Sequence, residues 1–356
     1  MLRTIAQSAL RPLWIPIRRR IEAMITAQVA AQPQALQQLQ TDSSNHLLTL
    51  VGRQQQLIES HGQQIESLSR EVKASRYAQF SPDPSWDQTS ADSPFFAYSN
   101  CQAADFYHPR FIQLCKLIDE RPRFHRKQWE WIFVLHKLLE SGAVREGARG
   151  LVFGVGREPL PAVFASLGVN IMATDAPLDL PTTSSWTNTN QHSAALEGLM
   201  YPSIVPEDRL RKHVTHAYCD MTAISPAFAG YDFNWSSCCF EHLGTLEAGM
   251  QFVVNAVEKT LKVGGVAVHT TEFNASSNED TVESGETVMY RRRDMEELVH
   301  RLRERGHEVE EFRIGPTAHA LDFCVDVPPY TGNVHLKLLL ANYVATSVGV
   351  VVRRGR

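Results

Sequence analysis

The sequence predicts an α/β fold, a doubly wound and mostly parallel sheet, with a helical extension in front of it. Two observations predict the sheet. An apolar run over residues 150–153 breaks at the closely spaced Gly154 and Gly156, and a second apolar run ends at Asp175. Later segments repeat the order strand, helix, strand, which is typical of parallel sheets. A third observation, a heptad pattern over residues 47–75, predicts the helical extension.

The first strand, over residues 150–153, ends in a glycine turn that favours a nucleotide site. Gly154 and Gly156 let the backbone approach a ligand closely, and the helix expected after them presents N–H groups. Asp175 lies about twenty residues further on, at the end of the second strand, where an acid can accept hydrogen bonds from ribose hydroxyls. We therefore expect a Rossmann-like sheet with a nucleoside-containing cofactor. A purely structural turn is the alternative.

Glu158 and Pro159, which follow the glycine turn, indicate which cofactor is bound. A dinucleotide site favours a third small residue where this chain has Pro159, and Glu158 stands just before it. A carboxylate there would repel a pyrophosphate, whereas it could face the sulfonium and amino groups of S-adenosylmethionine (SAM). SAM is therefore favoured over NAD. The alternative for Glu158 is an ordinary acid in the first turn of a helix.

Three later segments extend the sheet. Residues 216–221 are expected to form the end of a third strand that carries an acid, Asp220. Residues 231–244 are expected to form an apolar fourth strand that runs into a polar turn. A helix end, a Gly-Gly turn and a fifth strand follow over residues 261–272.

Together these segments resemble class I SAM-dependent methyltransferases over roughly residues 120–356. The resemblance is carried by residues 153–156, Asp175, Asp220, Met221, 236–243 and 261–265. It implies a seven-stranded sheet. It also implies a cofactor site made of Gly154, Gly156, Glu158, Asp175, Asp220, Met221 and Ser236. A bacterial subgroup associated with glycan or polysaccharide genes is similar in residues 125–130, 158–161, 235–243 and 269–272. This similarity implies a small-molecule or glycan acceptor.

Length and composition predict an ordinary soluble protein. The chain has 356 residues, of which 43% are hydrophobic, and a net charge of −4. A mildly acidic chain argues against nucleic acid as a partner, because phosphate contacts need clustered Lys and Arg. Six cysteines without a C-x-x-C pair are expected to be reduced thiols in a cytoplasmic protein. We expect an arm and coiled coil over residues 1–80, a linker over 81–103 and the methyltransferase domain over 104–356.

The N-terminal arm combines bulky apolar side chains with cations over residues 10–20. Such a segment could lie on the anionic inner face of a membrane, and a partner-binding or loosely ordered arm is the alternative. Pro12 and Pro16 argue against one clean helix there. No apolar run reaches the roughly 18 residues that a membrane span needs, and no signal-peptide core is evident.

The heptad pattern begins at Leu47. Its seam positions are Val51, Gln54, Ile58, His61, Ile65, Leu68, Val72 and Ser75. Alternating steps of four and three residues are typical of a coiled coil, and β-branched residues at one position favour a parallel homodimer, with a trimer as runner-up. A single helix that lies on the catalytic domain is the alternative.

The remaining segments are expected to complete the catalytic domain. A helix over residues 107–141 leads into the first strand, and a polar loop over 180–192, with His192, is a plausible lid beside a strand end. A helix over residues 294–305 precedes strands over 307–314 and 344–353. The resemblance implies that these two strands form an antiparallel, hairpin-like edge.

Methyl transfer mainly needs alignment of acceptor and methyl group, and a hydroxyl acceptor also benefits from a base. His242, after the fourth strand, is the first choice as base, and Glu241 beside it could instead face the cofactor. His269 and Glu272 are further catalytic candidates near the end of the fifth strand. A straight strand would place them on opposite faces, whereas a turn after Thr270 would let them converge. Such a pair could bind a divalent metal, but no third ligand is evident, so no metal is predicted.

Two basic segments are further candidates. Residues 290–295 are expected to open a helix with Asp294 as N-cap, and the alternative is an arginine that contacts an acidic sugar or phosphate. Residues 125–127 could hold the methionine carboxylate of SAM, or could be surface charge.

The leading functional expectation is a SAM-dependent methyltransferase that acts on a hydroxyl of a small molecule or glycan. The second is an NAD-dependent sugar-modifying enzyme, although the Tyr-x-x-x-Lys pairing of short-chain dehydrogenases is absent. The third is a non-catalytic partner with this fold, tethered by its coiled coil.

Overall fold

The computed structural model describes residues 2–78, 92–177 and 196–356. The chain divides into two compact units, Met1–Gln79 and Phe80–Arg356, and each is described by itself. The expected lid over residues 180–192, including His192, lies outside the described residues.

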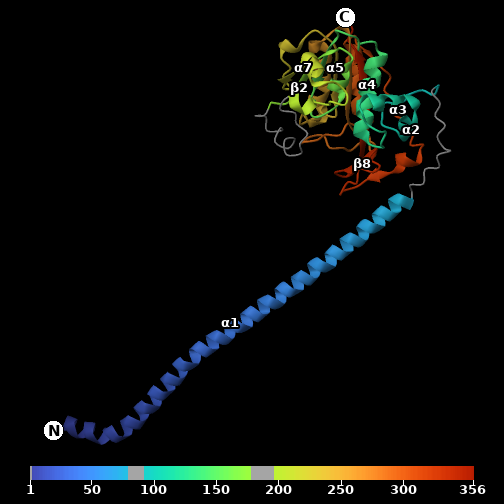
Figure 1. The fold of residues 1–356 in the computed structure, drawn as a ribbon. Coiled ribbons are helices and arrows are strands. Elements are labelled where there is room, and N and C mark those ends of the chain that lie inside the picture. The colour runs from blue at the N-terminus through green and yellow to red at the C-terminus, as the bar shows by residue number, and fades with distance from the viewer. Residues whose placement is uncertain (1, 79–91, 178–195) are drawn as a thin grey trace. The chain divides into compact units, whose positions relative to one another are not determined.

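The first unit is a single helix, α1 (Leu2–Ala78), drawn in blue in Figure 1. It continues through Pro12, Pro16 and Pro33, so the expectation that the prolines prevent one clean helix is wrong. Each proline removes one hydrogen bond inside the helix while neighbouring turns keep theirs, which bends a helix without necessarily ending it. Within the described part of the chain, no helix combines the length and the apolar character needed to cross a membrane.

The second unit is built on one mixed sheet. Its strands are β1 (Arg149–Phe153), β2 (Asn170–Asp175), β3 (Val214–Tyr218), β4 (Tyr231–Ser237), β5 (Leu261–Asn274), β6 (Glu308–Val309), β7 (Val325–Asp326), β8 (Lys337–Leu340) and β9 (Tyr343–Arg353). Their order is β3-β2-β1-β4-β5-β9-β8-β7, and β6 also pairs with β9. The strands β1 to β5 are parallel to one another. The chain order reverses beside β1, which is where sheets of this kind bind ligands.

The C-terminal strands differ from the prediction. The sheet has nine strands rather than seven, and β9 runs antiparallel to β5. On its other side β9 pairs antiparallel with β6, as expected, but also with β8, so it lies inside the sheet and does not form its edge. The strand expected over residues 307–314 is reduced to the two residues of β6. The valines of β9 are buried on both faces, which explains why this strand reads as a nearly continuous apolar run.

Seven α-helices are described in the second unit. They are α2 (Ala103–Tyr107), α3 (Pro109–Leu117), α4 (Arg126–Glu140), α5 (Leu160–Ser166), α7 (Glu207–His213), α8 (Leu246–Asn255) and α9 (Arg292–Glu304). Short turns of 3-10 helix are η2 (Leu196–Leu199), η3 (Pro226–Phe228), η4 (Phe240–His242) and η6 (Ala320–Phe323), and η5 (Ala256–Thr260) is a π turn that continues α8.

Two local predictions about helices need correction. The helix expected over residues 107–141 is broken between α3 and α4, where Asp119 adopts a φ of 54° and Pro122 follows. The expected N-cap of α9, Asp294, is instead its third residue, and its carboxylate accepts a hydrogen bond from the backbone N–H of the actual cap, Arg291.

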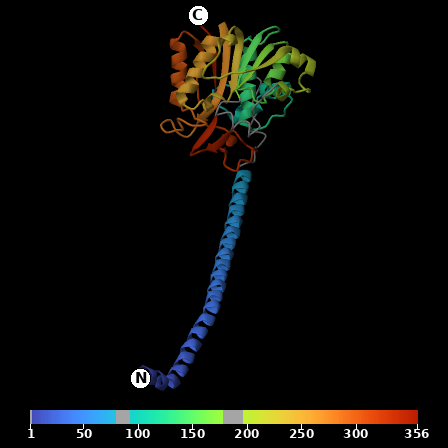
Figure 2. The same ribbon diagram turned by 90° about the vertical axis from the view of Figure 1, so that its left-hand side faces the viewer.

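Helices cover both faces of the sheet, as Figure 2 shows. One apolar core joins α4 and α5 to the sheet through side chains such as Trp129, Phe164 and Phe233. The other joins α8 and α9 to the opposite face through Phe252 and Leu298. The unit is therefore doubly wound.

The chain enters the domain before α2. Phe96 and Cys101 are buried, and the backbone N–H of Cys101 bonds to the carbonyl of Ser347. The described end of the segment expected to be a linker, residues 92–103, thus packs into the second unit. All six cysteines are free thiols.

Candidate functional site

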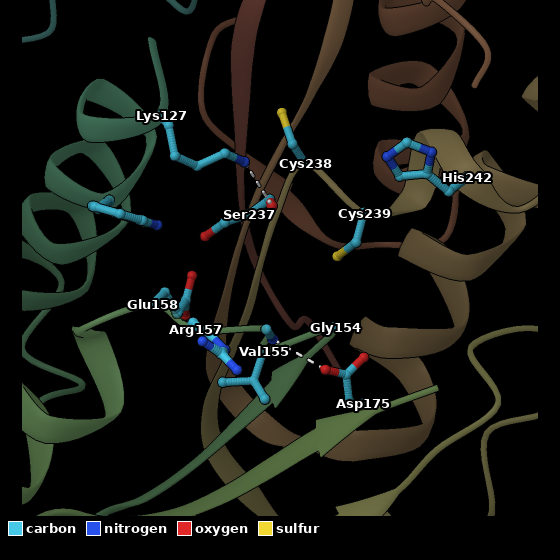
Figure 3. A pocket seen from close by; sticks show the side chains of 12 residues that line it. Lys127, Gly154, Val155, Arg157, Glu158, Asp175, Ser237, Cys238, Cys239 and His242 are labelled. Atoms are coloured by element: carbon cyan, nitrogen blue, oxygen red, sulfur yellow. Dashed lines mark hydrogen bonds between the residues drawn. The ribbon is translucent and has the colours of Figure 1, made fainter. Parts of the chain in front are cut away.

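A pocket opens at the carboxyl end of the parallel strands (Figure 3). Its wall comes from the start of α4, the turn between β1 and α5, the end of β2 and the segment after β4. The residues that line it are Lys127, Trp131, Gly154, Val155, Gly156, Arg157, Glu158, Asp175, Ser237, Cys238, Cys239 and His242.

The floor of the pocket is the glycine turn. Gly154 and Gly156 have φ values of 59° and 50°, a backbone conformation that residues other than glycine rarely adopt. A Cβ atom on Gly154 would lie 2.9 Å from the Cβ of Cys239. Glycine at 154 is therefore required both by the backbone and by the close approach of the segment after β4.

Asp175 closes the far end of this turn. One carboxylate oxygen accepts a hydrogen bond from the N–H of Gly156 at 3.1 Å, and the other accepts from the N–H of Ala176 at 2.8 Å. The residue is only 1% exposed. Two backbone donors thus fix the orientation of the carboxylate at the edge of the pocket.

Glu158 lines the pocket from the start of α5 and is buried. The indole N–H of Trp235 donates to its Oε1 at 2.5 Å. Burial raises the pKa of Glu158 to about 7, against the opposing effect of the Trp235 hydrogen bond. Pro159 caps α5 and Pro161 occupies its first turn, so this helix start has fewer N–H donors than an anion site would use.

Lys127 enters the same pocket from α4. Its Nζ lies 2.7 Å from a carboxylate oxygen of Glu130 and donates to the carbonyl of Ser237 at 3.3 Å. The two residues before it have other contacts. The ring of His125 accepts a hydrogen bond from the backbone N–H of Lys127 and so caps α4. Arg126 forms an ion pair with the buried Glu272. Of the basic segment at residues 125–127, Lys127 alone lines the pocket.

Cys238 belongs to a largely buried group of polar side chains, which we call the charge cluster. It consists of Arg126, Glu130, Cys238, Glu241, Glu272 and Ser347. The guanidinium of Arg126 lies 2.7 Å from Glu272 Oε2 and 3.6 Å from Glu130 Oε1. The hydroxyl of Ser347 and the thiol of Cys238 both donate to Glu130 Oε1.

The environment of the charge cluster shifts its acids in different directions. Although burial opposes the charged form, the adjacent Lys127 and Arg126 lower the pKa of Glu130. Burial raises the pKa of Glu272 to about 7, with Arg126 opposing. Burial and nearby carboxylates raise the pKa of the Cys238 thiol well above its usual value, and its backbone holds a φ of 51°.

His242 reaches the pocket from η4. Its Nδ1 lies 2.8 Å from the carbonyl oxygen of Glu286, so Nδ1 carries the hydrogen and the lone pair of the neutral ring is on Nε2. The Nε2 atom is 4.0 Å from Glu241 Oε1. This tautomer can accept a proton at Nε2.

His269 is separated from the pocket. β5 runs straight through Thr270 to Asn274, so His269 and Glu272 lie on opposite faces and do not converge. The His269 Nδ1 lies 2.8 Å from the hydroxyl of Ser236, and the ring is fully buried against Phe240 and Phe252. Burial lowers the pKa of His269 to about 3, which keeps it neutral.

The predicted site residues therefore divide into two groups. The pocket brings together Gly154, Gly156, Glu158, Asp175 and His242. Ser236, Met221, Asp220, His269 and Glu272 do not line it. Asp220 follows β3 and accepts hydrogen bonds from the N–H and hydroxyl of Thr222. Met221 packs in the apolar core.

Sequence reasoning did not single out Trp131, Arg157, Ser237 or Cys238 as pocket residues. Cys238 and Cys239 were expected to be reduced thiols, like the other four cysteines. The missed signal was their place directly after the fourth strand, since the carboxyl ends of parallel strands meet at the ligand edge.

Neither a protein-family model nor a curated protein matches this sequence. Among solved structures, the chain is similar to phosphoethanolamine N-methyltransferase 2 of Haemonchus contortus in complex with SAM. The identity is 14% over 62% of this chain and 52% of that chain, with a TM-score of 0.38. The matched part thus spans about half of that chain.

Two further solved structures give similar values. The 1,6-didemethyltoxoflavin-N1-methyltransferase of Burkholderia thailandensis is 15% identical over 65% of this chain and 80% of that chain, with a TM-score of 0.38. A SAM-dependent methyltransferase of Clostridium acetobutylicum is 13% identical over 64% and 92%, with a TM-score of 0.35. At such values the likeness carries no inference about what this chain binds, which has to come from its own pocket.

Proposed function

We propose that this protein is a SAM-dependent methyltransferase whose acceptor is a hydroxyl of a small molecule or glycan. The observation that carries the proposal is the buried carboxylate of Asp175, fixed by the N–H of Gly156 at the ligand edge of the sheet. An acid in this position can bind the ribose hydroxyls of an adenosine.

The other end of the pocket favours the methionine part of SAM over a pyrophosphate. Lys127 and Glu158 both line the pocket, and they offer one cation and one acid. A zwitterion with a carboxylate and an ammonium group matches such a pair. A pyrophosphate would meet the carboxylate of Glu158 and a helix start with two prolines.

Transfer of the methyl group requires an acceptor atom in line with the methyl–sulfur bond. The protein supplies this alignment by holding the cofactor at both ends. A hydroxyl acceptor gives up its proton as its oxygen attacks, and Nε2 of His242 can receive it. The glycan assignment rests on the sequence resemblance alone.

Calorimetry tests the cofactor assignment directly. We expect the purified protein to bind S-adenosylhomocysteine in the micromolar range, with one site per chain, and to give no heat with NAD. Heat with NAD and none with SAM or S-adenosylhomocysteine would contradict the proposal and favour a dehydrogenase.

The His242→Ala variant tests the base. We expect kcat to fall by about 10²- to 10⁴-fold while the affinity for SAM stays near normal, because the ring accepts a proton without holding the cofactor. His300→Ala is the matched control, since this histidine is 65% exposed on α9 and should leave kcat unchanged. An unchanged kcat in His242→Ala would remove His242 from the mechanism.

We further propose that α1 forms a parallel homodimer. The seam residues Val51, Ile58, Ile65 and Leu68 have exposed fractions of 56%, 71%, 68% and 59%. A second copy of the same seam would bury them. In the cytoplasm, the cations at the start of α1 would let it contact an anionic membrane face.

A truncated protein that lacks residues 1–80 tests both parts of this proposal. We expect it to bind S-adenosylhomocysteine as the full chain does, to be monomeric by light scattering, and to lose co-sedimentation with anionic vesicles. Ile58→Lys with Ile65→Lys should break the dimer, whereas the control pair Gln56→Lys with Gln63→Lys, outside the seam, should not. A dimeric truncated protein would contradict the role of α1.

A further inference from the structure

We propose that Cys238, Glu241 and Glu272 form a binding site for one divalent cation of the zinc type. Binding by these residues is independent of the proposed function. The catalytic use of the cation, which is to hold the acceptor hydroxyl, rests on that function.

The three residues converge from different parts of the chain. Cys238 and Glu241 follow β4, and Glu272 lies near the end of β5. The sulfur and one carboxylate oxygen from each acid all lie within 4.8 Å of one another. In a tetrahedral zinc site with bonds of about 2.0–2.3 Å, ligand atoms are roughly 3.5 Å apart. Small side-chain rotations would therefore bring the three atoms onto one ion.

One carboxylate oxygen among the proposed ligands lacks a hydrogen bond. Glu272 is 3% exposed, and its Oε1 has no hydrogen-bond partner, while Arg126 holds Oε2. A buried carboxylate oxygen without a partner is costly, because it has lost its bonds to water. A cation beside Oε1 would supply the missing interaction.

Each proposed ligand already has a neighbour that orients it. Arg126 bonds to Glu272 at 2.7 Å, and the hydroxyl of Thr271 donates to Glu241 Oε2 at 3.0 Å. The sulfur of Cys238 lies 3.8 Å from Nη1 of Arg126, which donates to it. Outer partners of this kind fix the ligands of metal sites and tune their basicity.

The choice of ion follows from the donor set. One sulfur and two carboxylate oxygens suit zinc, whereas magnesium prefers oxygen ligands alone. On binding, the metal–sulfur bond replaces the S–H bond of Cys238, and the thiol proton leaves to the buffer. Three protein ligands leave a fourth position open. Because Cys238 also lines the pocket, a hydroxyl at that position would stand beside the cofactor.

The full-length protein, stripped of metal by a chelator, provides the test. We expect zinc chloride to bind with one site per chain in calorimetry, with proton release that shows as a heat dependent on the buffer. Magnesium chloride should bind far more weakly. Cys238→Ser and Glu272→Gln should each weaken zinc binding by more than about 100-fold, since loss of a partner of a ligand alone costs 10- to 100-fold. Glu279→Gln, exposed on the surface, should match the unmodified protein.

Alkylation gives a second measurement. Zinc should slow the modification of Cys238, read by mass spectrometry of its peptide, and should leave Cys324 unaffected. Unchanged zinc affinity in both Cys238→Ser and Glu272→Gln, or no zinc binding to the stripped protein, would overturn the site. Binding of S-adenosylhomocysteine to the same samples separates the two proposals, because it can persist when the metal site fails.

Discussion

Replacing Asp175 with Ala should weaken the binding of S-adenosylhomocysteine by about 1–3 kcal/mol, a rise in Kd of roughly 5- to 150-fold. The carboxylate is 1% exposed and is already oriented by the N–H groups of Gly156 and Ala176. Hydrogen bonds from ribose to such a fixed charge are lost on substitution. Calorimetry with the full-length variant measures the change.

The same substitution also removes the acceptor of the Gly156 N–H, so the turn itself could loosen. Asp175→Asn separates the two effects, because the amide keeps one acceptor oxygen and the shape of the side chain but loses the charge. We expect its Kd to lie between those of Asp175→Ala and the unmodified protein, with an unfolding midpoint near normal. An unchanged Kd in Asp175→Ala would place the ribose elsewhere.

The pocket turn could be predicted from the sequence because its determinants are local. The backbone at Gly154 and Gly156 needs glycine, and Asp175 follows at the end of the next strand. Each signal lies within about one strand, helix and strand of the others. The parallel order of β1 to β5 follows from the same repeated pattern.

The charge cluster could not be predicted because its partners are distant in the chain. Glu130 and Ser347 are 217 residues apart, and Arg126 meets Glu272 only after α4 packs on the sheet. The spacing of residues along the sequence does not indicate contacts between such distant residues. For His269 and Glu272 the sequence left two alternatives open, and because β5 runs straight the two lie on opposite faces rather than converging.

The position of β9 in the sheet was predicted wrongly for a related reason. The valines of β9 indicate burial but not which strands flank it, and β5, β8 and β6 come from separate segments. At α1, the prolines predicted a break from local geometry, whereas a helix of 77 residues keeps enough other hydrogen bonds to continue.

Replacing Glu130 with Ala should destabilise the second unit by about 3–5 kcal/mol, because it removes a fully buried carboxylate that pairs with two partly buried cations. Glu130 is fully buried, and Lys127 lies 2.7 Å from it and Arg126 3.6 Å. The substitution also removes the acceptor of the Ser347 hydroxyl and the Cys238 thiol. Urea unfolding followed by far-UV circular dichroism measures the change in the free energy of unfolding.

Glu140 provides the matched control on the same helix. Its side chain is 59% exposed, and it lies 3.6 Å from His136 and 3.8 Å from Lys137. Exposed pairs of this kind contribute little, so Glu140→Ala should change the free energy by less than about 1 kcal/mol. Should Glu130→Ala fail to fold, Glu130→Gln keeps the volume and a hydrogen-bonding oxygen, and we expect it to be less stable than Glu140→Ala. Equal stabilities would mean that Arg126 and Lys127 are satisfied without Glu130, and the charge cluster would then not depend on this carboxylate.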